Sequence, residues 1–187
     1  MLYIELGDDM MRHLILIPVT AWLFAAGCSL QPPFEDPFTR PQVAWTPNLV
    51  LDIESAARVL GNESRLEKVT AYLDDQTLAY QSEFRNEEPD PATGKTGVLG
   101  YMFEEYRSAE AARSYLHSTL RANRLRPEDA ILIEGGVELH YFTGTDVVRM
   151  VLILKENRLL RLKVNPVTSR YSLAEFKNVA AELARRL

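Results

Sequence analysis

The chain has 187 residues, which is enough for one domain of ordinary size with a single buried core. Hydrophobic residues make up 47% and charged residues 25%, a balance typical of globular proteins that excludes a fibrous or wholly disordered chain. The net charge of −5 argues against a nucleic-acid partner, and the single cysteine excludes an internal disulfide framework and a cysteine-rich zinc site.

An apolar run at residues 14–26 is the first element of the chain, and it ends in Ala25-Ala26-Gly27-Cys28. As a helix this run would rise about 20 Å, against roughly 30 Å of bilayer hydrocarbon, so it is short for a stable membrane span. A short apolar run that ends in small residues is typical of a secretory signal peptide. The sequence therefore predicts a signal peptide over residues 1–27.

The residues before this run predict a later start of translation. Glu5, Asp8 and Asp9 stand where signal peptides carry positive charge. A start at Met10 or Met11 would remove all three acids and leave Arg12 with the amino terminus before the apolar run.

The tetrapeptide that ends in Cys28 resembles the lipobox of bacterial lipoproteins, although Ala25 stands where leucine is usual. The resemblance covers residues 11–28 and implies diacylglycerol on Cys28, cleavage between Gly27 and Cys28, and an acylated amino terminus that anchors the protein to a membrane. Because Ser29 rather than aspartate follows the cysteine, it also implies the outer membrane, facing the periplasm, in a bacterium with two membranes. The alternative is a buried free thiol in an ordinary helix.

Residues 28–50 are rich in proline, which disfavours helix and sheet and favours extended chain. We expect them to form a lipidated tether ahead of a single domain at residues 51–187. A solvated spacer has no need of aromatic residues, so those in the tether either dock on the domain, contact a partner or are neutral; they are Phe34, Phe38 and Trp45.

The first half of the domain predicts a helix, three strands and a second helix. Asp52 is a suitable cap for a helix that Gly61 can end. Apolar residues alternate at 69–73 and 78–84 around a polar turn, which indicates a hairpin, and residues 98–106 predict a third strand. Ser108 caps a helix that runs to about Asn123.

The second half predicts three further strands and a closing helix. The apolar runs are residues 131–142, 147–154 and 159–164, with turns at Gly144 and at Glu156-Asn157. Ser172 and Glu175 are spaced as a capping box before the last helix. The order α-βββ-α-βββ-α predicts an α+β fold, a two-layer sandwich of a mainly antiparallel sheet of about six strands with three helices.

We find no recognised catalytic motif. His117 and His140 are the histidines outside the predicted signal peptide, and neither sits in a recognised catalytic motif. A metal site would require both to converge with carboxylates such as Glu134 or Glu138, whereas a single histidine on a helix or strand is more often structural or solvated. Gly94-Lys95-Thr96 lacks the earlier glycine of a phosphate-binding loop, and Glu104 and Glu105 are expected on opposite faces of a strand. The sequence thus predicts neither an enzyme nor a metal site.

Gly135-Gly136 interrupts the fourth predicted strand, where glycine permits either a simple bend or the close approach of another backbone. In the second case these glycines would form a binding rim with His140 and Tyr141, and with Tyr101 if the strands pair suitably.

Three functions fit these features. The lack of catalytic motifs and the aromatic tether favour a non-catalytic binding or assembly module of the cell envelope, lipid-anchored and presenting one sheet face to a protein partner. One alternative is a small-molecule carrier or sensor with an apolar pocket between sheet and helices, lined by Tyr72, Tyr80 and Phe103. The other is an unrecognised hydrolase with polar groups around His117 or His140. No cofactor is expected beyond the covalent lipid on Cys28.

Overall fold

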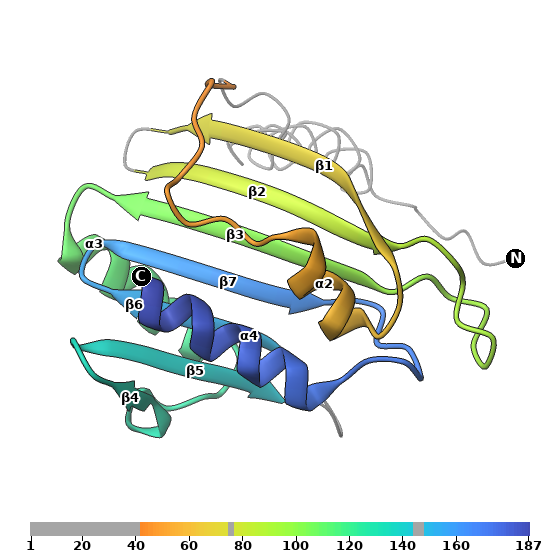
Figure 1. Ribbon diagram of the computed structural model, residues 1–187. Coiled ribbons are helices and arrows are strands. Elements are labelled where there is room, and N and C mark those ends of the chain that lie inside the picture. Colours follow the sequence, from red (N-terminus) through yellow and green to blue (C-terminus); the bar gives the residue numbers. More distant parts are fainter. Residues whose placement is uncertain (1–41, 75–76, 144–147) are drawn as a thin grey trace, which may run out of the picture. The chain divides into compact units, whose positions relative to one another are not determined.

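The computed structural model describes residues 42–74, 77–143 and 148–187. The predicted signal peptide, its cleavage site at Gly27 and Cys28, the first part of the tether and the turn at Gly144 lie outside the described residues. The described part is built on one antiparallel sheet in the order β1-β2-β3-β7-β6-β5-β4 (Figure 1). Its strands are β1 Ser64–Leu73, β2 Thr77–Asn86, β3 Val98–Tyr106, β4 Ile131–Ile133, β5 Val137–Thr143, β6 Val148–Lys155 and β7 Arg158–Val164.

The sheet consists of a three-strand meander, β1-β2-β3, and a four-strand meander, β4-β5-β6-β7, which meet through the antiparallel pair β3 and β7. The helices are α2 Ile53–Leu60, α3 Ala109–Ala122 and α4 Leu173–Arg186, and a short 3₁₀ helix, η3, covers Pro127–Asp129. The predicted α+β class and the antiparallel sheet are therefore confirmed. The described strands number seven rather than six.

The additional strand arises at Gly135-Gly136. Residues 131–142, expected as one strand, are divided there into β4 and β5, which pair with each other as a hairpin. Both glycines have positive φ, 84° at Gly135 and 76° at Gly136, a conformation that side chains with a Cβ disfavour. The pair therefore forms a hairpin turn.

Local capping interactions explain where α2 begins and ends. Asp52 Oδ1 accepts a hydrogen bond from the Ser55 backbone N–H at 2.6 Å, and Gly61 ends the helix with φ of 71°. Both ends were predicted from the sequence.

The predicted capping box of α4 forms only in part. Ser172 Oγ accepts from the Glu175 backbone N–H at 3.2 Å, but the Ser172 N–H donates to Val59 O at 3.0 Å. The Glu175 carboxylate lies 3.4 Å from Arg58. The tertiary contact between α4 and α2 has replaced the second half of the local motif.

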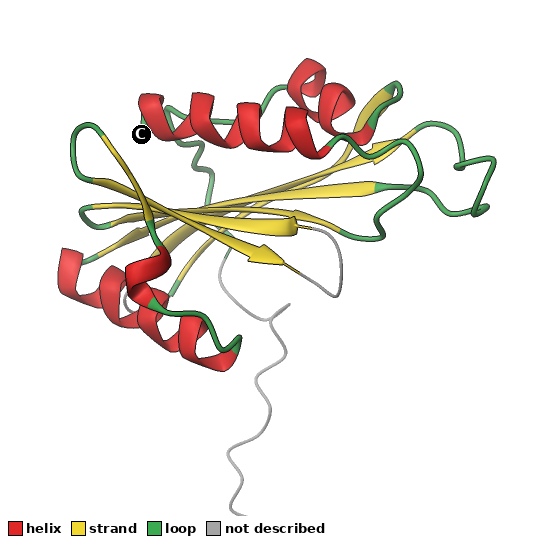
Figure 2. Ribbon diagram, turned by 90° about the horizontal axis from the view of Figure 1, so that it is seen from below, coloured by secondary structure: helices red, strands yellow, loops and turns green. Residues whose placement is uncertain are grey.

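The helices lie on both faces of the sheet, as Figure 2 shows, with α2 and α4 on one face and α3 on the other. We name these the α4 face and the α3 face. The main core fills the α4 face, where Tyr101 and Phe176 are the largest fully buried side chains. The expected two layers thus become three where α3 packs, because the apolar residues Leu152, Leu154 and Leu159 also point to its side.

Residues 42–50, assigned from the sequence to the tether, pack on the domain. The Val43 N–H donates to Ala71 O at 3.0 Å beside β1, and the chain then crosses the α4 face of the sheet (Figure 1). The rings of Trp45 and Phe103 lie 6.0 Å apart, and Tyr101 Oη donates to Leu49 O at 2.5 Å. Of the three tether aromatics, Trp45 docks on the domain; Phe34 and Phe38 lie outside the described residues.

Candidate binding surfaces

The residues proposed as a binding rim do not come together. Gly135 and Gly136 form the β4–β5 turn, whereas His140 and Tyr141 point to opposite faces because they are neighbours on one strand. His140 is buried on the α3 face, and Tyr141 lies on the α4 face with Lys177 Nζ 5.9 Å from its ring centre. Tyr101 is on β3, which β7 and β6 separate from β5, and it is fully buried.

His140 lies in a charged cluster beneath α3. Its Nε2 is 3.6 Å from Glu138 Oε2, and the other Glu138 oxygen accepts from Arg113 of α3 at 2.8 Å. Burial lowers the pKa of His140, Glu138 opposes that shift, and the nearby His117 adds to it. The imidazole is therefore held neutral at physiological pH, and its Nε2 has no hydrogen-bond partner within the described residues.

The two histidines are neighbours across the α3–sheet interface. His117 lines a shallow groove on α3 together with Glu110, Arg113, Ser114, Arg121 and Pro127. Among the residues that the structure describes, no three His, Cys, Asp or Glu side chains are grouped so as to hold a metal ion. Glu104 and Glu105 lie on opposite faces of β3, as expected.

A large part of the α3 face is not covered by any described helix, because α3 packs only at one end of the sheet (Figure 2). We call this surface the open face. It lies on β1, β2, β3 and β7 and consists of Lys68, Thr70, Tyr72, Gln81, Glu83, Arg85, Met102, Arg161 and Lys163.

Most side chains of the open face are partly buried by their neighbours. Arg85 pairs with Glu67 at 2.5 Å and with Glu83 at 3.7 Å, and the Arg161 guanidinium contacts the Met102 sulfur. These contacts restrict the long side chains before a partner binds. Less side-chain entropy would therefore be lost on association.

The two edges of the sheet resist pairing with another strand. In β1, residues 65–69 are exposed, and a bulge at Glu67 lies beside charged Arg65 and Lys68. Bulges and edge charges are devices that prevent strand addition. The other edge, β4, has only three residues, although its Leu132 is 74% exposed.

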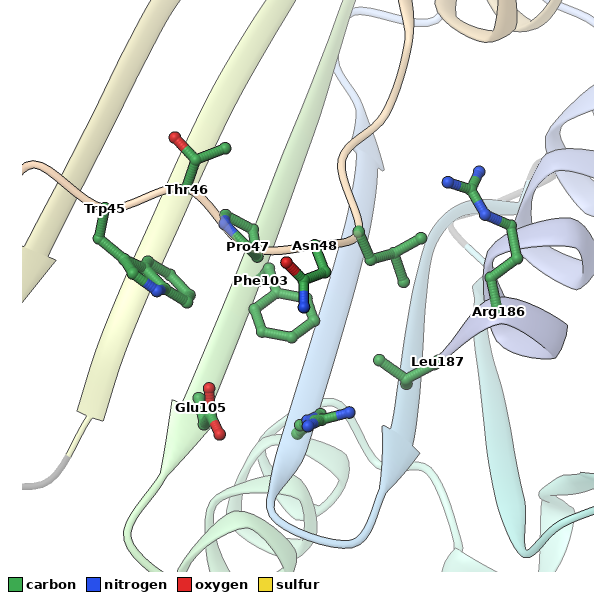
Figure 3. A pocket seen from close by; sticks show the side chains of 10 residues that line it. Trp45, Thr46, Pro47, Asn48, Phe103, Glu105, Arg186 and Leu187 are labelled. Atoms are coloured by element: carbon green, nitrogen blue, oxygen red, sulfur yellow. The ribbon is translucent and has the colours of Figure 1, made fainter.

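The three residues expected to line an apolar pocket are separated. Tyr80 and Phe103 are buried in the main core on the α4 face, while Tyr72 belongs to the open face. A different pocket of about 200 Å³ lies where residues 45–49 pass over the ends of β3 and β7 (Figure 3). Its lining is Trp45, Thr46, Pro47, Asn48, Leu49, Phe103, Glu105, Arg158, Arg186 and Leu187.

None of the described helices has the length and apolar composition that crossing a membrane requires. Comparison with protein-family models, with curated proteins and with solved structures found no match to this chain.

Proposed function

We propose that this chain is a lipid-anchored, non-catalytic binding module of the bacterial cell envelope, and that its open face receives a protein partner. The part of the α3 face that no described helix covers carries this proposal. An antiparallel sheet can leave one face to water, but such a face is usually polar throughout. Here it combines charged residues with Tyr72 and Met102.

The composition of the open face supports a protein partner. Tyrosine, methionine and arginine are enriched in the cores of protein interfaces, and the open face contains Tyr72, Met102, Arg85 and Arg161. Charges of both signs are present, with Glu83 beside Arg85 and Lys163 at the margin. A mixed surface of this kind favours a polar protein surface over a polyanion.

The anchor would keep this face close to a membrane. As polyproline-like chain, residues 28–41 could span about 43 Å. Lipid on Cys28 would hold the domain on the bilayer, because several acyl chains exceed the two hydrophobic signals that stable anchoring needs. In a bacterium with two membranes, we expect this to be the outer membrane on its periplasmic side.

The anchor is tested by expressing the full-length chain and a Cys28→Ser variant in a bacterium with a labelled fatty acid. We expect label and membrane retention for the first protein and neither for the second. An unlabelled native chain that stays in the membrane would instead identify residues 14–26 as an uncleaved anchor.

The partner surface is tested by placing a photo-crosslinking amino acid at Gln81, at the centre of the open face, in the native host. The matched control carries the same group at Arg185, which is exposed on α4. We expect an envelope protein to crosslink only from position 81, and the adduct to be lost on adding Met102→Lys. Equal adducts from both positions, or none from position 81, would contradict a role for the open face.

A further inference from the structure

The pocket beneath residues 45–49 has a preformed apolar floor. Phe103 is 5% exposed, and Trp45 and Leu187 lie on either side of it (Figure 3). The Tyr101 hydrogen bond to Leu49 O holds the crossing segment in place above the sheet. The pocket volume of about 200 Å³ suits a small molecule.

Two opposite charges stand at the mouth of this pocket. Glu105 and Arg158 are directly opposed on β3 and β7 and share the α4 face. Directly opposed side chains have Cβ atoms about 5 Å apart, which is close enough for an ion pair. Within the described residues, however, neither the Glu105 carboxylate nor the Arg158 guanidinium forms an ion pair or a hydrogen bond.

We propose that this pocket binds a free α-amino acid with an apolar side chain. The ligand carboxylate pairs with Arg158 and its ammonium group with Glu105, while its side chain contacts Phe103 and Trp45. The two charged groups of an α-amino acid are separated by one carbon atom, so a single head group can engage both members of a cross-strand pair. This site is on the opposite face of the sheet from the proposed partner surface, and neither proposal depends on the other.

The charges around the pocket favour this zwitterion over simpler ions. A cation alone would satisfy Glu105 but would meet Arg158 without a counter-charge, and an anion alone would leave Glu105 unpaired. Arg186 at the end of α4 also lines the pocket and adds positive potential to it. The pocket volume suits a side chain of about the size of leucine.

Trp45 supplies the signal for the test. The chain has two tryptophans, so a full-length protein with Trp22→Phe, kept in detergent, reports only on the pocket. We expect L-leucine to change the Trp45 emission saturably, with an affinity between micromolar and millimolar, as a ligand of this size allows. Equilibrium dialysis with radiolabelled leucine measures the same binding without relying on fluorescence.

Two leucine analogues and three variants decide the assignment. 4-Methylpentanoate lacks the ammonium group and 3-methylbutylamine lacks the carboxylate, and each should bind at least tenfold more weakly than leucine. Arg158→Gln and Glu105→Gln should each weaken leucine binding at least tenfold, because each leaves one ligand charge unpaired. Arg185→Gln changes the residue next to Arg186 on α4 but lies outside the pocket lining, and it should leave leucine binding unchanged.

Thermal unfolding of each variant establishes that it remains folded. Absence of leucine binding by both methods would overturn the proposal. So would equal binding of either analogue, or full retention of binding in the Arg158 and Glu105 variants.

Discussion

Asp90 shows how a single carboxylate joins two distant loops. Its two oxygens accept from the Ser169 backbone N–H at 2.6 Å and from Ser169 Oγ at 2.7 Å. Within its own loop it also accepts from the Ala92 N–H and the Thr93 hydroxyl. These hydrogen bonds, those from Ser169 above all, hold the pKa of Asp90 far below its usual range. The sequence showed only an aspartate between two prolines, because its partner is 79 residues away.

The buried His140 should make the stability of the folded protein depend on pH. Because burial lowers the pKa of His140 in the folded protein, the unfolded chain binds more protons at mildly acidic pH. The contribution of neutral His140 to the free energy of unfolding is therefore complete above the unfolded pKa of about 6.5, and it declines as the pH falls through that value. The groups that face His140 are Glu138 on its own strand, Arg113 and His117 on α3, and Asp129.

We expect the free energy of unfolding of the native chain to fall between pH 7.5 and pH 5.5. In His140→Phe that slope should be smaller, whereas His117→Gln, which changes the other histidine, should retain most of it. Urea denaturation at a series of pH values measures the slope. An unchanged slope in His140→Phe would show that another group causes the pH dependence.

At the level of the elements, local sequence was sufficient wherever the determining contacts are local. The caps at Asp52 and Ser108 were predicted, and each accepts a hydrogen bond from a backbone N–H three residues later. Strand β3 was predicted over its full length because its signal, the pattern of apolar residues, lies within consecutive positions of the chain. The predicted hydrogen bond from the Ser172 N–H to the Glu175 side chain does not form, because a contact distant in sequence competes with it. The Glu175 carboxylate pairs with Arg58 of α2 instead.

Two glycines of positive φ provide a matched test of a close approach between elements. A Cβ on Gly61 would lie 2.0 Å from Arg170 O, whereas a Cβ on Gly135 meets nothing within 4 Å. Gly135→Ala should cost only the left-handed backbone strain, about 1–2 kcal/mol. Gly61→Ala should cost clearly more, because the loop at Arg170 must also move.

Thermal unfolding of the two glycine variants measures this difference. Equal losses of stability would mean that the loop at Arg170 moves without a free-energy penalty. In that case, Gly61 would be required only because its positive φ ends α2.

For the molecule as a whole, the shared sheet couples the two cores. Leu116 of α3 is fully buried on the α3 face, and Trp45 lies on the α4 face. Leu116→Ala should lower the free energy of unfolding by about 2–5 kcal/mol, the range for a leucine truncated in a packed core. If the sheet unfolds as one unit, Trp45 must report that loss although no α3 residue touches it.

Urea denaturation of the Trp22→Phe background, followed by Trp45 fluorescence and by far-ultraviolet circular dichroism, tests the coupling. We expect both signals to shift together in Leu116→Ala. An exposed substitution on the same helix, Arg121→Ala, should change little. A Trp45 transition that stays in place would show that α3 unfolds separately from the rest.

The sequence by itself determined the order of the described α-helices, the spans of most described strands and the α+β class. These features follow from alternation, caps and turn residues, whose effects reach only a few positions along the chain. It also supplied the lipobox resemblance at Cys28, which is a local motif outside the described residues.

Only the tertiary structure decided that β3 pairs with β7, that α3 packs on the face opposite α2 and α4, and that residues 42–50 pack on the sheet. Each depends on apolar surfaces that meet across long stretches of chain, which no local pattern encodes. The same reason explains the candidate sites. His140 and Tyr141 are adjacent in sequence yet face opposite ways, whereas Trp45, Glu105 and Arg158 lie far apart in sequence and line one pocket.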